Sequence, residues 1–182
     1  LDYTLDYSIH LKREAQGFLI LRQKGEVKCC LFCHFINPVE IVSEGKLLQT
    51  ASNACYICTP GQPLYYKATP IYMLHNFIHF HVSSEEEFAQ TGIPLNRVFY
   101  TDRQEYITRT VEYLGWAKSS GLKDRAESIK STMTEFFLSL AQEQKGTVMY
   151  GTDRNVVFDD LRSLIYRSPG EWNVTSMANY TH

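Results

Sequence analysis

Hydrophobic and polar positions follow two different patterns along the chain. Up to about residue 82, short segments rich in aromatic and β-branched residues recur at intervals of about ten residues, with turn-forming residues between them. Short strands at this spacing are typical of an all-β barrel or sandwich. The segments expected to contain strands are residues 18–21, 27–36, 40–50, 53–59 and 63–82.

Beyond Ser83 and Ser84 the apolar residues follow the period of a helix. The two serines precede three consecutive glutamates, which is typical of a helix start, because carboxylates are stabilised near the positive end of the helix dipole. Further helices are expected to end near Gly121, near Gly146 and before Pro169. Their apolar stripes are Ile107, Val111 and Leu114; Ala126, Ile129, Met133, Phe136, Phe137 and Leu140; and Phe158, Leu161, Leu164 and Ile165.

Composition narrows the function classes. The 182 residues are enough for one domain with a proper core, or one domain with an appendage. The formal net charge of −2 is a poor electrostatic match for nucleic acid, and no apolar run approaches the length of a membrane span. Five cysteines, an odd number, do not suit a secreted disulfide framework, so we expect a cytoplasmic protein without membrane contact.

The cysteines and histidines offer two metal-site hypotheses. Cys30, Cys33, Cys55 and Cys58 form two C-x2-C pairs, but residues i and i+3 of a strand point to opposite faces, so we expect buried free thiols. The segment HFHVSSE resembles the second half of the metal-binding motif of cupins. It supports an alternative interpretation, a small metal-dependent cupin enzyme that uses His79, His81 and Glu85.

The segment from Pro60 to Phe80 contains two aromatic strands separated by Thr69-Pro70. On periodicity alone we expect a hairpin. Its alternating faces could line an aromatic cavity or fill the core of the barrel with the protein's own side chains.

Three stretches resemble the effector-sensing part of AraC-type transcription regulators. NACYICTPGQPLYY is similar to that family's strand, proline–glycine turn and aromatic strand, and YMLHNFIHF to the strand that closes its barrel. FDDLRSLIYRSPGEWNVTSMANYTH is similar to its linker-proximal helix and the opening of its first helix-turn-helix. The order and spacing of these motifs over nearly the whole chain carry the resemblance.

The resemblance implies an α+β fold, a cupin-like β-barrel (double-stranded β-helix) followed by a helical dimerisation segment. Residues 1–92 would form the ligand-sensing barrel and residues 93–146 a helical dimerisation pair. Residues 147–182 would form the linker and the first helices of a truncated helix-turn-helix domain. DNA would then be bound only through a C-terminal domain whose recognition helix follows His182.

The resemblance also implies ligand sensing without catalysis and without a cofactor. Sugar-binding members of the family use residues that correspond to Arg13, Tyr66, His75 and Phe77, which offer a cation, a hydroxyl, an imidazole and a stacking face to a sugar-like effector. Leu64 stands where the family has a second polar residue. The segment before Arg13, which carries Tyr3 and Tyr7, is expected to fold over the mouth of the barrel as a lid.

A homodimer is expected through the second helix of the pair. Phe136 and Phe137 point about 100° apart on a helix, so one face cannot bury both rings well. A leftover apolar strip on the surface usually marks an interface. The predicted interface residues are Ile129, Met133, Phe136, Phe137 and Leu140.

Overall fold

The computed structural model describes residues 1–121 and 123–149, so the third helical stripe and the helix-turn-helix resemblance lie outside the described residues. Leu1–Gln144 form one compact unit, which contains the strands and most of the helical segment. The elements are β1 (Tyr3–Ala15), β2 (Leu19–Arg22), β3 (Cys30–Phe35), β4 (Val39–Ser43), β5 (Lys46–Gln49), β6 (Ala54–Cys58), β7 (Leu64–Ala68), β8 (Tyr72–Val82), α1 (Glu85–Gln90), β9 (Val98–Tyr100), α2 (Gln104–Ser119) and α3 (Arg125–Met149).

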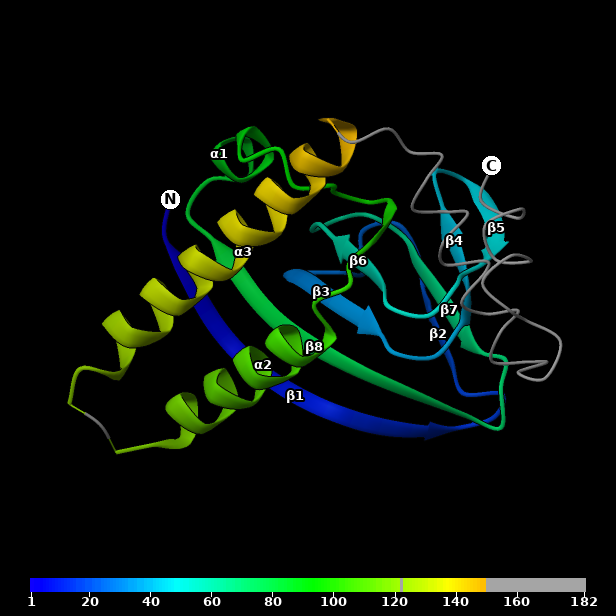
Figure 1. The fold of residues 1–182 in the computed structure, drawn as a ribbon, viewed down its shortest axis with the longest axis horizontal. Coiled ribbons are helices and arrows are strands. Elements are labelled where there is room, and N and C mark those ends of the chain that lie inside the picture. Colours follow the sequence, from blue (N-terminus) through cyan, green and yellow to red (C-terminus); the bar gives the residue numbers. More distant parts are fainter. Residues whose placement is uncertain (122, 150–182) are drawn as a thin grey trace, which may run out of the picture. The chain divides into compact units, whose positions relative to one another are not determined.

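The strands form two antiparallel sheets. The larger sheet has the order β1-β8-β3-β6-β9, and the smaller has the order β2-β7-β4-β5. The helices α2 and α3 cross the face of the larger sheet (Figure 1). The predicted α+β fold with a cupin-like barrel and following helices is therefore confirmed.

Alternation along the strands of the larger sheet creates two apolar cores. In β3, Cys30 and Phe32 face the helices, whereas Leu31, Cys33 and Phe35 face the space between the sheets. All six residues of this strand are buried, as expected for a sheet that is covered on both faces.

The apolar stripe of α3 belongs to the core between the helices and the larger sheet. Phe136 and Phe137 are both fully buried, because Phe32 contacts both rings and Tyr3 stacks on Phe137 with ring centroids 5.4 Å apart. The idea that one face could not bury both rings is wrong. The predicted interface residues Ile129, Met133, Phe136, Phe137 and Leu140 are all buried within this single chain, so they are not available as a surface seam.

The two aromatic strands β7 and β8 do not form the expected hairpin. β7 pairs with β2 and β4 in the smaller sheet, and β8 pairs with β1 and β3 in the larger one. The Thr69-Pro70 segment therefore carries the chain from one sheet to the other. Their inward side chains still meet, since both strands contribute to the core between the sheets.

The first strand is built into the larger sheet rather than folded over the mouth of the barrel as a lid. β1 pairs with β8 along its length, and Tyr3 is buried against the helices. Two β-bulges interrupt the pairing, one between Leu5 and Tyr7 and one between Ile9 and Lys12. Each inserts one extra residue and exchanges the faces toward which the following side chains point.

No helix among residues 1–121 and 123–149 is long and apolar enough to cross a membrane.

Candidate functional site

His75 on β8 is a polar side chain buried in the core between the two sheets. Its side chain is 2% exposed, and neither ring nitrogen has a hydrogen-bond partner among the described residues. Its ring is parallel to that of Phe35, with an interplanar angle of 2° and centroids 6.1 Å apart. Tyr66 and Phe77 complete the surroundings, with centroids 6.3 and 5.2 Å from the imidazole.

Burial keeps this imidazole neutral. Desolvation, assisted by the nearby positive charge of Lys12, lowers the pKa of His75 from 6.5 to about 4. A neutral imidazole has one N–H donor and one acceptor nitrogen. His75 therefore presents both kinds of hydrogen-bonding group in an apolar setting.

Two more of the predicted site residues lie beside His75. Tyr66 reaches this space from β7 in the opposite sheet, and its pKa is raised by burial and by the thiol of Cys33. Phe77 is half-buried and follows His75 by two residues on β8, so the two side chains share one face. Three of the four predicted side chains, from two different sheets, are thus brought together.

The prediction for Arg13 is wrong. Arg13 is exposed and its guanidinium lies over the ring of Tyr72, 4.3 Å from the centroid. In the β1–β8 register Arg13 is opposite Leu74, and Lys12 is opposite His75. The bulge that follows Ile9 causes this exchange, because one extra residue turns the next side chains to the other face.

Lys12 and Glu14 therefore take the place that the sequence reasoning assigned to Arg13. The Lys12 ammonium lies 3.8 Å from the Glu14 carboxylate, and both groups act electrostatically on the site: Lys12 on His75, and Glu14 on Tyr66. A bulge cannot be read from residue types alone. The only signal in the sequence was that the charged residues Lys12 and Glu14 flank Arg13 and would share the opposite face of the strand.

His79, His81 and Glu85 do not converge on a cation. His81 pairs with Asp6 at 3.2 Å, His79 stacks on Tyr7 with centroids 4.3 Å apart, and Glu85 starts helix α1. No cluster of three metal-ligating side chains occurs among residues 1–121 and 123–149. In this arrangement His79, His81 and Glu85 do not form the cation site that the alternative of a metal-dependent cupin enzyme requires.

The cysteines are free thiols, and Cys30, Cys33, Cys55 and Cys58 are buried, as predicted. Cys29 is half-buried, and its sulfur lies 3.5 Å from His79 Nδ1, a contact that the sequence reasoning missed. Burial raises the pKa of the Cys29 thiol and lowers that of His79. Both shifts oppose the thiolate–imidazolium pair of a cysteine nucleophile.

No protein-family model and no curated protein sequence matches the chain. Similar solved structures include the cupin domain of an XRE-family transcriptional regulator from Enterobacter cloacae, at 15% identity and a TM-score of 0.32, over 40% of this chain and 77% of that one. They also include ToxT from Vibrio cholerae bound to (E)-4-(8-methylnaphthalen-1-yl)but-3-enoic acid, at 6% identity and a TM-score of 0.48, over 98% of this chain and 71% of ToxT. In a second ToxT structure, at 7% identity and a TM-score of 0.46, the match covers 79% of this chain and 57% of ToxT. At these identities the likeness concerns the fold alone.

The finding that Lys12, and not Arg13, lies opposite His75 can be tested by the titration of His75. Replacing the cation opposite the imidazole, Lys12→Met, should raise the pKa of His75, because Lys12 lowers it. The matched change Arg13→Met should leave it unchanged, since Arg13 faces away from His75. NMR of the imidazole resonances across a pH series measures both. A larger effect of Arg13→Met would contradict the register.

Burial of neutral histidines makes the stability of the fold pH-dependent. His34 and His75 both have a pKa of about 4 in the folded chain, below the ordinary 6.5, so the unfolded chain binds more protons between these values. Stability should be complete above about pH 6.5 and should fall as the pH drops toward 4, by up to roughly 3 kcal/mol for each histidine.

Urea denaturation at several pH values checks this expectation. His75→Leu should remove about half of the loss of folding stability that occurs as the pH falls. At pH 7 this variant should be at least as stable as the wild type, because it deletes two unpaired buried nitrogens. An unchanged pH dependence in His75→Leu would show that the imidazole is not buried as described.

Proposed function

We propose that this chain is the ligand-sensing and dimerisation part of an AraC-type transcription regulator, and that it binds a small, sugar-like effector between its two sheets. The observation that carries the proposal is the buried neutral imidazole of His75, which has no partner among the described residues. An unsatisfied buried polar group costs about 1–3 kcal/mol. A ligand that satisfies its nitrogens would recover that free energy.

The chemistry around His75 suits a ligand rich in hydroxyl groups. A hydroxyl both donates and accepts, so one or two of them can satisfy the two nitrogens of a neutral imidazole. The half-buried ring of Phe77 can stack on the apolar face of a sugar, and Tyr66 belongs to the opposite sheet, with its ring 6.3 Å from the imidazole. Lys12 adds a cation at the edge of the site, which favours a sugar acid over a neutral sugar.

The ionisation of Cys29 and His79 favours binding without catalysis. Cys29 and His79 are the nucleophile and base that lie in contact near the site, but the pKa of Cys29 is raised and that of His79 is lowered. A thiol in this state is a poor nucleophile. In the proposal the protein acts in the cytoplasm, and the DNA contact belongs to a helix-turn-helix part outside the described residues.

Calorimetric titration against a panel of neutral sugars and sugar acids tests the ligand. We expect His75→Leu to weaken binding of any hit about tenfold or more, since each lost hydrogen bond contributes about 1 kcal/mol. Lys12→Met should weaken only the sugar acids. The exposed His81→Gln serves as the control and should bind as the wild type does. Equal affinity of a hit for the wild type and His75→Leu would refute the site.

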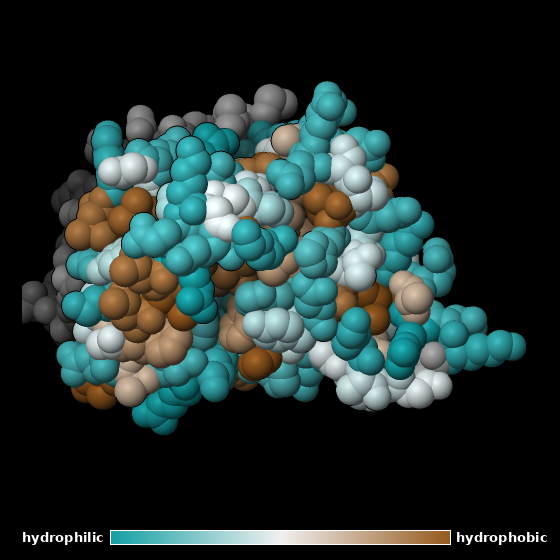
Figure 2. Space-filling model, turned by 180° about the vertical axis from the view of Figure 1, so that it is seen from behind, coloured by the Kyte–Doolittle hydropathy of each residue, from teal (hydrophilic) through white to brown (hydrophobic). Residues whose placement is uncertain are grey.

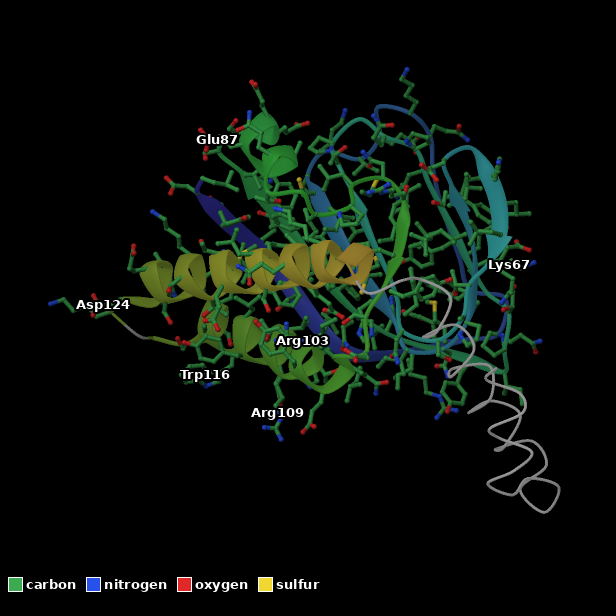
Figure 3. All side chains as sticks on the ribbon, turned by 45° about the horizontal axis from the view of Figure 1, so that its top comes forward. Lys67, Glu87, Arg103, Arg109, Trp116 and Asp124 are labelled. Carbon is green, nitrogen blue, oxygen red and sulfur yellow. The ribbon has the colours of Figure 1, made fainter. Side chains whose placement is uncertain are left out.

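The proposed homodimer needs a seam other than the buried stripe of α3. The outward side of the helical layer carries exposed apolar side chains, of which Trp116 on α2 is 55% exposed and Leu138 on α3 is 44% exposed. Figure 3 shows Trp116 and Arg109 on the side of α2 that faces away from the sheets. Other apolar patches appear among polar residues on the reverse face (Figure 2). We favour the helical layer, because Trp is enriched at interface centres.

Sedimentation equilibrium at micromolar concentration tests the dimer. Trp116→Glu should dissociate it, whereas Arg109→Ala, on the same helix, should not. Met133→Glu should unfold the chain instead, because it places a charge in the core. A wild-type monomer at these concentrations would rule the dimer out.

A further inference from the structure

Asn76 lies between the two predicted site residues on β8 but points the other way. His75 and Phe77 face the space between the sheets, whereas Asn76 is fully buried on the face that packs against the helices. A buried amide on a largely apolar face is costly unless its groups are paired. The pairing of Asn76 is nearly complete, and it connects three separate elements.

The three hydrogen bonds of Asn76 determine its orientation. The backbone N–H of Leu11 on β1 donates to Oδ1 at 2.8 Å, and Nδ2 donates to Thr108 Oγ1 on α2 at 2.9 Å. Nδ2 also lies 3.1 Å from His34 Nδ1 on β3. Since a backbone N–H can only donate, Oδ1 is the acceptor, both hydrogens of Nδ2 are used, and His34 accepts at Nδ1. Neutral His34 therefore carries its proton on Nε2.

Leu11 is the residue on which the geometry of the site depends. It has a positive φ of 47°, a conformation that costs free energy for a residue with a side chain, and it belongs to the bulge between Ile9 and Lys12. On β8 only one residue, Asn76, separates the partners of Ile9 and Lys12. The hydrogen bond from Leu11 to Asn76 thus holds the bulge that turns Lys12 toward His75.

β1 is also attached directly to α2. Ser8 Oγ donates to the backbone oxygen of Val111 at 2.9 Å, and Lys118 Nζ donates to the backbone oxygen of Leu5 at 2.6 Å. A side chain at Gly115 would lie only 3.3 Å from the backbone oxygen of Ser8, so α2 and β1 approach closely there. If a change at the ligand site displaces β1, the contacts between β1 and α2 must therefore change as well.

We propose that Asn76 is a positioning residue that couples the ligand site to helix α2. Its Oδ1 holds the Leu11 bulge, and so the position of Lys12 against His75, while its Nδ2 donates a hydrogen bond to Thr108. A ligand that moves Lys12 changes this contact, and a change in α2 moves Lys12. The regulatory meaning rests on the proposed function, but the coupling itself is a property of the chain without ligand.

The coupling can be measured from the helix side, with the imidazole of His75 as the reporter. Thr108→Val removes the hydroxyl that Asn76 binds, on the far face of the sheet from His75. We expect the His75 imidazole resonances and their titration to shift in this variant. Thr108→Ser, which keeps the hydroxyl, should restore them. Thr110→Val is the matched control on the same helix, since Thr110 Oγ1 bonds within the helix, to Tyr106 O at 2.9 Å.

A second measurement reads the bulge itself. In Asn76→Leu the Leu11 amide loses its acceptor and should exchange with solvent about fivefold faster or more. His75 should shift in the same sense as in Thr108→Val. No shift of His75 in Thr108→Val, or an equal shift in Thr110→Val, would overturn the coupling. Failure of the sugar panel with an intact Thr108 effect would refute the proposed ligand and leave the coupling standing.

Discussion

The larger sheet is covered on both faces, and this constraint determines how β8 and β1 are used. At His75 and Asn76 one face of β8 is packed against helices and the other against the smaller sheet, so neither of these side chains can be satisfied by solvent. The two polar residues at the middle of β8 solve this problem differently. Asn76 is paired with three elements of the fold, whereas both ring nitrogens of His75 lack a partner among the described residues.

This difference separates the structural amide of Asn76 from the imidazole of His75, which we propose as a ligand contact. Paired buried polar groups stabilise a unique arrangement, and unpaired ones lower stability. The unpaired ring nitrogens of His75 lower the stability of the fold. The positive φ of Leu11, which the nearby bulge requires, lowers it further. Strain and unsatisfied polarity that gather around one position are typical of binding sites, where a ligand supplies the missing contacts.

Patterns of residue type predicted the elements, whereas the resemblance to AraC-type regulators suggested most of the site. The resemblance pointed to Tyr66, His75 and Phe77, which the strands bring to inward faces, and helical spacing identified the buried residues of α2 and α3. The predictions failed where a single backbone feature changes the direction of side chains. Arg13 was misplaced because of one extra residue in β1, and the hairpin was wrong because Thr69 and Pro70 pass between sheets. The interface stripe was misassigned because the rings of β3 and β8 cover both Phe136 and Phe137, which no helical wheel of α3 can show.

The central claim is that His75 is a buried, neutral imidazole available to a ligand. The most direct test is the NMR titration of this histidine in the wild-type chain, with nitrogen-15 labelling to resolve its two ring nitrogens. The account predicts a neutral ring at pH 7 and a titration midpoint near the pKa of about 4. A midpoint at or above the ordinary 6.5 would contradict it, because it would mean that the ring is solvated or already paired with a carboxylate.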